Sequence, residues 1–198
     1  MNQSYLDNLA EISANIKNAS LRSGDKIKLV LVSKSQKKDS IKKIYGLGYR
    51  NFGENYLQEA REKIESLNDC NIEWHFIGKL QSNKIREIVK LFDWIHTVSS
   101  KKHMDMIEKF SMECNKIMNV CIQINIDGEK SKSGLSLNQV DDFISISENY
   151  RNIQTRGIMA IPSKTNALEK KEQSYALLSE KFTELRAKLV NFDTLSLG

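Results

Sequence analysis

The sequence predicts an α/β protein, a (β/α)8 barrel of which the chain supplies seven strands. Short β-branched apolar runs alternate with helical patterns from one end of the chain to the other. Successive strands begin roughly two to four dozen residues apart, which leaves room for a helical crossover but is too long for a hairpin. No GxGxxG or GxxxxGK[ST] motif follows the first strand, so the main alternative, a doubly wound nucleotide-binding sheet, loses support.

The first part of the chain alternates regularly between the two patterns. Tyr5, Leu9, Ile12 and Ile16 recur at helical spacing and indicate an opening helix. Nearly continuous apolar character at 28–33 is typical of a strand covered on both faces. The next expected elements are a helix through 41–47, a strand at 51–53, a helix at 57–67, a strand at 74–78, a helix at 85–92 and a strand at 94–98.

The same alternation continues to the last residue. Met104, Ile107, Phe110 and Cys114 share one face of a helix, and the run at 120–125 is the most strand-like in the chain. The later expected elements are a polar loop at 127–134, a helix at 140–146, a strand at 156–162, a helix at 178–189 and a strand at 194–198.

Length and composition favour a single domain over residues 1–198, within the usual range of about 100 to 200 residues. A content of 40% hydrophobic and 28% charged residues supplies a buried core and does not resemble a disordered chain. A complete (β/α)8 barrel has eight strands and about 250 residues. We therefore expect a barrel truncated after strand seven, with the C-terminal helix and strand missing.

Net charge, the length of apolar runs and the N-terminal sequence argue against several classes of protein. The formal net charge of +5 suits an anionic partner, but the basic pairs lack interleaved aromatic residues, so we expect no nucleic-acid binding. No apolar run approaches the about 20 residues that span a bilayer, so we expect no membrane insertion. The absence of a secretory leader, together with three widely spaced cysteines, predicts a cytoplasmic protein. The three histidines show no HxH or HExxH spacing, so no metal site is expected.

Candidate chemistry lies where strands end, because ligands of α/β folds gather at the carboxyl ends of the strands. Lys34 follows the first strand. Partial desolvation there would lower its pKa and leave a neutral amine able to attack a carbonyl carbon, although most of the 30 Lys and Arg residues are expected to be solvated. His75 alternates with Trp74 and Phe76 and is expected to face the barrel interior. The loop at 127–134 either binds an anion or is an ordinary polar connection, and the sequence leaves both open.

Six segments of the chain occur together, in order, in one family. They are VSKSQ around Lys34, FGENYLQE at 52–59, WHFIGKLQSNK at 74–84, SKSG at 131–134, RGIMAIP at 156–162 and DTLSLG at 193–198. On these segments the chain resembles the pyridoxal phosphate homeostasis protein family, whose fold is similar to the N-terminal barrel of alanine racemase. Six ordered segments are far more specific than any one motif.

The resemblance implies pyridoxal 5′-phosphate as the cofactor, carried by Lys34 as an internal aldimine. Asn55, Met159, Ser196 and Gly198 match positions near the cofactor in the family pattern, as does His75. The chain departs from the family after Lys34, where Ser, Gln and Lys replace the frequent Thr, Lys and Pro. The family's last strand, rich in Arg, Gly and Thr, is expected to close the barrel and hold the phosphate, and this sequence does not contain it.

The implied function is intracellular cofactor homeostasis without established catalytic turnover, so no catalytic residues are expected. The expected partners are the small-molecule cofactor and apoenzymes that need it, and we expect a monomer. The alternative is a pyridoxal phosphate-dependent amino-acid racemase or aldolase, which needs an acid/base residue on the ring face opposite Lys34. A third interpretation, a basic RNA-binding or scaffold protein, rests only on the +5 charge.

Overall fold

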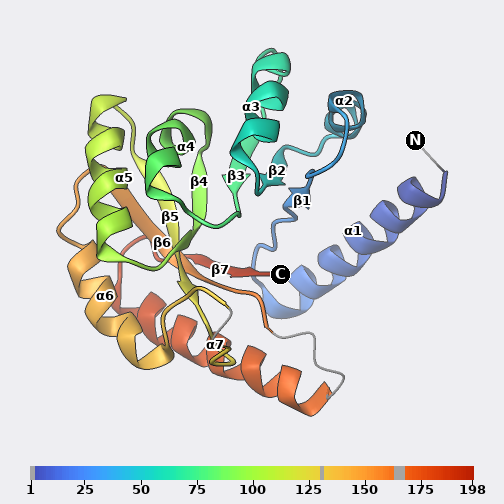
Figure 1. Cartoon of the computed structure of the whole chain (residues 1–198). Coiled ribbons are helices and arrows are strands. Elements are labelled where there is room, and N and C mark those ends of the chain that lie inside the picture. Colours follow the sequence, from blue (N-terminus) through green and yellow to red (C-terminus); the bar gives the residue numbers. More distant parts are fainter. Residues whose placement is uncertain (1–2, 130–131, 163–167) are drawn as a thin grey trace.

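The computed structural model describes residues 3–129, 132–162 and 168–198, and these form a parallel sheet surrounded by helices (Figure 1). Seven strands pair in chain order from β1 to β7, and every pair is parallel. The strands are β1 (Leu31–Val32), β2 (Asn51–Glu54), β3 (Glu73–Phe76), β4 (Trp94–Val98), β5 (Met118–Ile124), β6 (Ile153–Ala160) and β7 (Thr194–Leu197). The predicted seven-stranded βα architecture is confirmed.

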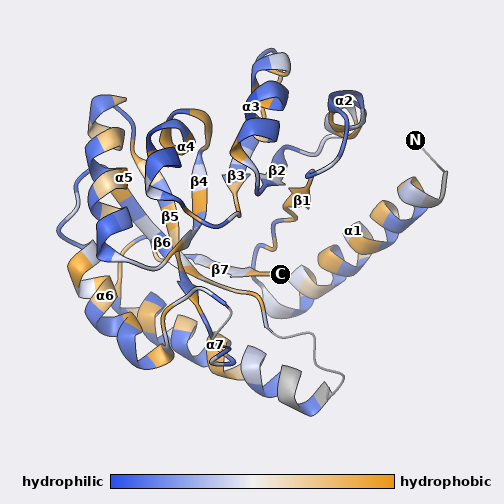
Figure 2. Ribbon diagram, in the orientation of Figure 1, coloured by the Kyte–Doolittle hydropathy of each residue, from blue (hydrophilic) through white to orange (hydrophobic). Residues whose placement is uncertain are grey.

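The first helix precedes β1, and the other helices lie in the connections between successive strands. They are α1 (Gln3–Ser23), α2 (Lys38–Gly46), α3 (Leu57–Ser66), α4 (Ile85–Leu91), α5 (Lys101–Glu113), α6 (Val140–Ser147) and α7 (Leu168–Lys188), with short 3-10 turns at η1 (Ser82–Lys84) and η2 (Leu137–Gln139). Apolar and polar residues alternate around these helices (Figure 2). None of the described helices is both long and apolar enough to cross a membrane.

The sheet is curved, as a barrel requires. His96 on β4 and Ser196 on β7 are hydrogen-bonded, with 2.8 Å between Nδ1 and Oγ. Neighbouring strands lie about 4.8 Å apart, so β4 and β7 would be about 14 Å apart in a flat sheet. A direct contact across three strand spacings therefore shows that β4 to β7 bend around a common interior.

The main core lies between the outer face of the sheet and the helices. Phe52, Trp74 and Phe76 point outward from β2 and β3 into this core, where they join buried residues of the helices such as Ile41 and Ile88. A separate group inside the curve of the sheet consists of Trp94, Cys121 and Met159. The outer face thus carries most of the apolar burial, and the inner face is left for polar chemistry.

Two elements differ from the sequence prediction at the β1 side of the molecule. On α1 the expected apolar face is covered only near Leu9, while Tyr5 and Ile12 are 44% and 46% exposed. The helix extends away from the body of the molecule (Figure 1), and a hydrogen bond between the hydroxyl groups of Ser13 and Tyr49 marks where it meets the rest. Strand β1 is two residues long rather than six, since it pairs only with β2 in the described chain.

Candidate functional site

Lys34 occupies a tight turn directly after β1. The turn closes through a hydrogen bond of 3.0 Å from the Gln36 amide to the Ser33 carbonyl oxygen, and Ser35 takes a left-handed backbone conformation with φ of 60°. The Lys34 side chain is exposed. The expectation of a partly desolvated lysine is therefore wrong, because the turn carries Lys34 off the short strand into solvent. What the structure offers instead is an accessible primary amine at a fixed place.

Asn55 lies beside this turn, at the end of the next strand. Val32 pairs with Gly53, so Lys34 and Asn55 each follow that pair by two residues. The Oδ1 atom of Asn55 is buried and has no hydrogen-bond partner among the described residues. Its backbone passes so close to Gly78 that a Cβ atom there would lie 2.2 Å from the Asn55 carbonyl oxygen. A buried amide oxygen without a partner among the described residues, at the same end of the sheet as the exposed Lys34, is a feature that a polar ligand would satisfy.

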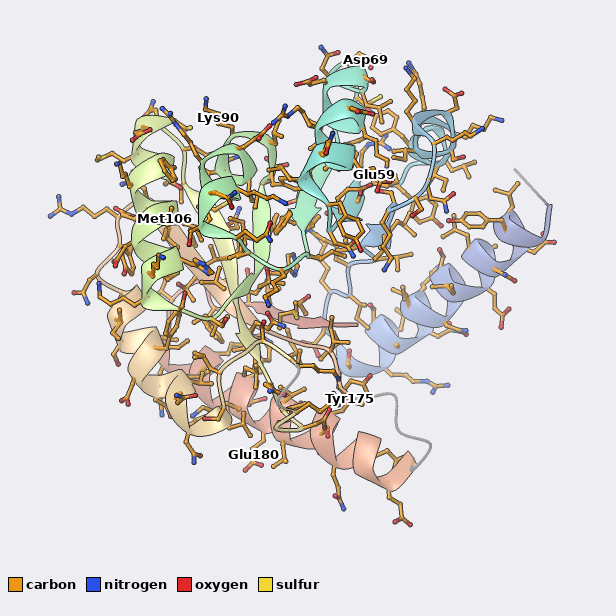
Figure 3. The ribbon with its side chains drawn as sticks, viewed as in Figure 1. Glu59, Asp69, Lys90, Met106, Tyr175 and Glu180 are labelled. Carbon is orange, nitrogen blue, oxygen red and sulfur yellow. The ribbon has the colours of Figure 1, made fainter. Side chains whose placement is uncertain are left out.

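Behind the turn lies a charged cluster that the sequence prediction missed, formed by Ser33, Glu54, Glu59 and Lys63. The Lys63 ammonium is buried and lies 2.6 Å from Glu54 Oε1 and 2.6 Å from Glu59 Oε1. Ser33 donates its hydroxyl to Glu54 Oε1 at 2.7 Å. The hydrogen bond from Lys63 holds the pKa of the Glu59 carboxyl below its usual value, and the backbone N–H of Ser35 acts in the same direction. Glu59 lies on α3 (Figure 3).

The predicted residues of the last two strands also lie together. Met159 and Ser196 are register partners on β6 and β7. Met159 is buried inside the curve of the sheet against Trp94 and Cys121. The amide of Gly198 donates to the Ala160 carbonyl oxygen at 3.3 Å. These residues form the opposite edge of the sheet from Lys34 and Asn55, and the curvature of the sheet turns the two edges toward each other.

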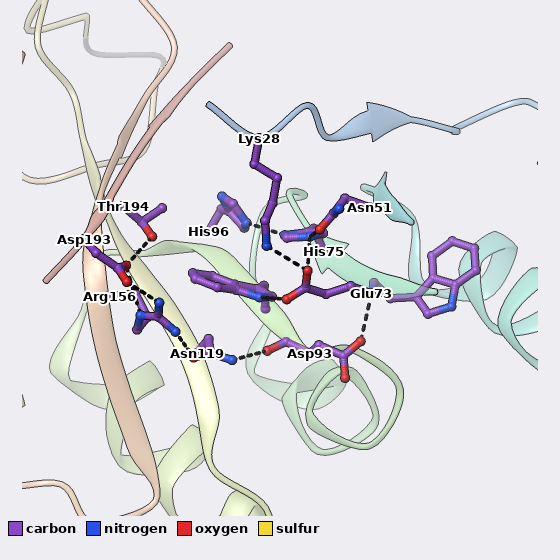
Figure 4. Close-up of polar contacts among 12 residues, drawn as sticks. Lys28, Asn51, Glu73, His75, Asp93, His96, Asn119, Arg156, Asp193 and Thr194 are labelled. Carbon is purple, nitrogen blue, oxygen red and sulfur yellow. Dashed lines mark hydrogen bonds and ion pairs between the residues drawn. The ribbon is translucent and has the colours of Figure 1, made fainter. Parts of the chain in front are cut away.

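A chain of hydrogen bonds crosses the barrel interior through two histidines, and Figure 4 shows its part from Asn51 through His75 to His96. Asn51 Oδ1 lies 3.1 Å from His75 Nε2, His75 Nδ1 lies 2.9 Å from His96 Nε2, and His96 Nδ1 lies 2.8 Å from Ser196 Oγ. The prediction that His75 faces the interior is confirmed. Its ring stacks on Trp94, with centroids 5.7 Å apart.

Both histidines in this chain of hydrogen bonds, His75 and His96, are neutral at pH 7. Burial, together with the proximity of His96, lowers the pKa of His75 to about 3, and burial lowers the pKa of His96 to about 4. Asn51 Oδ1 and the Glu73 carboxylate, 3.9 Å from His75 Nε2, both favour a proton on that nitrogen. The remaining directions follow: His75 Nδ1 accepts from His96 Nε2, and His96 Nδ1 accepts from the Ser196 hydroxyl.

Two ion pairs lie at the amino end of the barrel interior. Glu73 accepts from Lys28 Nζ at 2.9 Å and from Trp94 Nε1 at 2.7 Å (Figure 4). On the other side, Arg156 pairs with Asp193 and stacks over Trp94, with its guanidinium carbon 5.1 Å from the ring centroid. A ligand inside the curve of the sheet is therefore expected to enter at the carboxyl ends of the strands, where Lys34 lies.

A cavity of about 210 Å³ borders the Lys34 turn, since Ser33 and Gln36 contribute to its lining. Its lining includes Tyr5, Ile41, Ile44 and Phe52, which belong to α1, to α2 and to the outer face of the sheet. It belongs to the layer between helices and sheet and contains none of the predicted site residues. Of the polar loop at 127–134, residues 130–131 lie outside the described structure, so the two interpretations of that loop remain predictions.

The fold and the site define a class of protein. The sequence profile of the family described as "Alanine racemase, N-terminal domain" matches residues 8–198. An alanine racemase from Clostridium difficile shares the fold, with a TM-score of 0.72 at 16% identity over 98% of this chain and 53% of that chain. The protein is a barrel of the alanine racemase N-terminal type.

Closer relatives give the particular family. A pyridoxal phosphate homeostasis protein from Pasteurella multocida is 40% identical over 198 residues, which cover 96% of this chain and 85% of that protein. Its counterpart in Escherichia coli is 36% identical, over 96% of this chain and 84% of that protein. The chain belongs to the pyridoxal phosphate homeostasis protein family.

Solved structures agree with this assignment. PipY of Synechococcus elongatus without PLP superposes with a TM-score of 0.83 at 31% identity, covering 91% of this chain and 86% of that one. PipY with PLP bound superposes with a TM-score of 0.78 at 29% identity, covering 89% of this chain and 84% of that one.

Proposed function

We propose that the chain binds pyridoxal 5′-phosphate covalently through Lys34 and holds it as part of intracellular cofactor homeostasis. The observation that carries the proposal is the exposed Lys34 amine at the carboxyl end of β1, beside a buried Asn55 oxygen that lacks a partner among the described residues. An aldehyde needs an accessible amine, and a substituted ring needs hydrogen-bonding groups next to it. The residues at this edge fit such a cofactor.

Each predicted site residue has a distinct task in this proposal. When bound, the cofactor supplies an aldehyde that reacts reversibly with a primary amine, which suits storage and release. Lys34 provides the amine, and Asn55 provides an amide that orients the ring. Met159 gives an apolar surface inside the barrel, while the hydroxyl of Ser196 and the backbone of Gly198 would hold polar groups of the cofactor. Holding the cofactor requires no acid/base residue.

The decisive experiment follows the colour of the bound cofactor. Protein incubated with pyridoxal 5′-phosphate should acquire the absorbance of a lysine-bound cofactor, and borohydride should fix the label on Lys34 in a peptide map. Lys34→Ala should stay colourless, while the matched variant Lys37→Ala, three residues away on the same exposed segment, should bind normally. A wild-type protein that stays colourless would refute the proposal.

The alternative function, a racemase or aldolase on the same fold, is distinguished from cofactor holding by a second measurement. Catalysis on an amino acid needs a group that moves the α-proton, and the two interior histidines are hydrogen-bonded to each other and to Asn51 and Ser196. We therefore expect no α-proton exchange in deuterated water with a panel of amino acids. Exchange above the rate of free cofactor would favour the enzyme.

We further propose that the protein acts as a cytoplasmic monomer that passes the cofactor to apoenzymes. The exposure of Lys34 supports transfer, because a second protein can reach the amine without unfolding the barrel. Light scattering tests the monomer. Transfer is tested by reactivation of an apoenzyme from cofactor-loaded protein, in competition with a scavenger for the free cofactor.

A further inference from the structure

We infer that Lys63, on α3, is the positioning residue that fixes the Lys34 turn in place. Its ammonium donates to the Ser33 carbonyl oxygen at 2.6 Å, the peptide group that links Ser33 to Lys34. The inference rests on the proposed function of Lys34 and assigns it a structural support that lies 29 residues further along the chain. Neither Lys63 nor its partners belong to the predicted set of cofactor-binding residues.

The cluster forms hydrogen bonds with the turn on both sides of Lys34. Before it, the Ser33 hydroxyl donates to Glu54 Oε1 at 2.7 Å. After it, the Ser35 amide donates to Glu59 Oε1 at 2.5 Å. Lys63 connects the two carboxylates, because its Nζ lies 2.6 Å from Glu54 Oε1 and 2.6 Å from Glu59 Oε1. The Lys63 ammonium therefore links the hydrogen bonds that hold the residues on each side of Lys34.

Each N–H bond of the Lys63 ammonium has an acceptor. An ammonium has three N–H bonds, and Lys63 has three acceptors: the Ser33 carbonyl and the two carboxylates. Lys63 is 6% exposed and Glu54 is fully buried. A buried ammonium whose N–H bonds are all satisfied restrains its acceptors, and one of these is the Ser33 carbonyl oxygen of the turn.

The turn needs such support because its backbone is strained. Ser35 has φ of 60°, a left-handed conformation that costs a residue with a side chain free energy relative to the extended or right-handed alternatives. Without the bond from its amide to Glu59, the turn would be expected to relax, and the Lys34 amine would sample many positions. The cluster instead presents Lys34 beside Asn55 before any ligand arrives, which lowers the entropy cost of covalent capture.

The test removes the Lys63 ammonium while leaving the net charge of the cluster unchanged, because one cation and one of the two carboxylates are neutralised together. Lys63→Met alone leaves the Glu54 carboxylate buried without a cation and could fail to fold, so the main variant is Glu54→Gln with Lys63→Met. Gln at position 54 still accepts from the Ser33 hydroxyl. The matched control is Lys101→Met, which removes an exposed pair of the same i, i+4 spacing with Asp105.

Two readouts are measured on folded protein. Hydrogen exchange of the Ser35 amide, followed by NMR without cofactor, should be at least tenfold faster in the double variant than in the wild type or the control. After incubation with pyridoxal 5′-phosphate and borohydride, the share of label on Lys34 relative to Lys37 and Lys38 should fall at least fivefold. A purely stabilising role would leave this site selectivity unchanged in a protein that still folds.

The outcomes separate the inference from the proposed function. If the Ser35 amide stays protected in the double variant, Lys63 does not fix the turn. If that amide exchanges faster but the label still selects Lys34 as in the wild type, Lys63 does not position the Lys34 amine. If the wild type captures no cofactor, the proposed function fails, and the exchange of Ser35 still decides whether Lys63 fixes the turn.

Discussion

The chain buries two polar clusters that differ in charge: the Lys63 cluster behind the Lys34 turn and the histidine chain inside the barrel. The Lys63 cluster contains one cation and two carboxylates, packed between β1, β2 and α3. The histidine chain from Asn51 to Ser196 is neutral and lies against Trp94. Ion pairs stabilise the Lys63 cluster, whereas hydrogen bonds between uncharged groups stabilise the histidine chain.

This difference predicts opposite vulnerabilities. A buried ion pair tolerates a change of pH as long as both partners stay charged, but it cannot lose one partner without leaving a buried charge. A buried neutral chain tolerates the loss of one member at moderate cost, but protonation places a charge where water cannot solvate it. Substitution should therefore damage the first cluster more, and acid should damage the second.

The largest effect is expected for Lys63→Met. Removing the cation leaves Glu54 as an unpaired buried carboxylate, which should lower the free energy of unfolding by about 3–5 kcal/mol in a urea titration. Adding Glu54→Gln should restore most of that loss. Lys101→Met, at an exposed pair, should cost less than about 1 kcal/mol. A loss below about 1 kcal/mol for Lys63→Met would show that the cluster is not held by charge.

Acid should act through the histidine chain. The unfolded histidines titrate near 6.5 and the folded ones at about 3 and about 4, so the unfolded state binds more protons as the pH falls below 6.5. Stability is therefore complete above about pH 7 and is lost as the pH falls, by about 1.4 kcal/mol per histidine at pH 5.5. NMR titration should find both rings neutral at pH 5.5. Rings that titrate near pH 6.5 in the folded protein would contradict the prediction.

Loss of one end of the histidine chain should cost less. Ser196→Ala leaves His96 Nδ1 buried without its partner, which should lower the unfolding free energy by about 1–2 kcal/mol. Ser145→Ala, an exposed hydroxyl on α6 that bonds only its own helix, is the control and should change little. The Ser35 amide should exchange at the wild-type rate in both variants, since the two clusters share no residue.

The smallest effect concerns the strained turn. Glycine adopts positive φ without strain but gains more freedom in the unfolded chain, so Ser35→Gly should change the unfolding free energy by no more than about 0.5 kcal/mol. Ser40→Gly, inside α2, should instead cost about 0.5–1 kcal/mol. A loss above about 1 kcal/mol at position 35 would mean that the Ser35 side chain itself supports the turn.

Much of the fold could be read from local patterns. Short, mostly apolar runs between helical patterns predicted the seven strands, and the spacing between these runs predicted a parallel sheet. Alternation along β3 correctly placed His75 on the face opposite Trp74. These features depend on neighbouring residues, so the sequence contains them directly.

The two polar clusters could not be predicted in the same way. Lys63 resembled one of many solvated lysines, although its place between Ala60 and Leu67, at helical spacing on a buried face, was the available signal. The contact between His96 and Ser196 depends on how far the sheet curves, which no local pattern specifies. The exposure of Lys34 also went unseen, because it follows from the shortness of β1.

The strand order of the sheet has a consequence for how the chain folds. Each strand pairs with the one made before it, and the register partners are between 19 residues (His75 and Trp94) and 37 residues (Gly157 and Thr194) apart. The sheet can therefore grow in the order of synthesis, one βα unit at a time. The bond from His96 to Ser196, which joins positions 100 residues apart, must wait for β7. Pairing at such long separation is slow, so the barrel interior is expected to become ordered last, after the Lys34 turn has already formed.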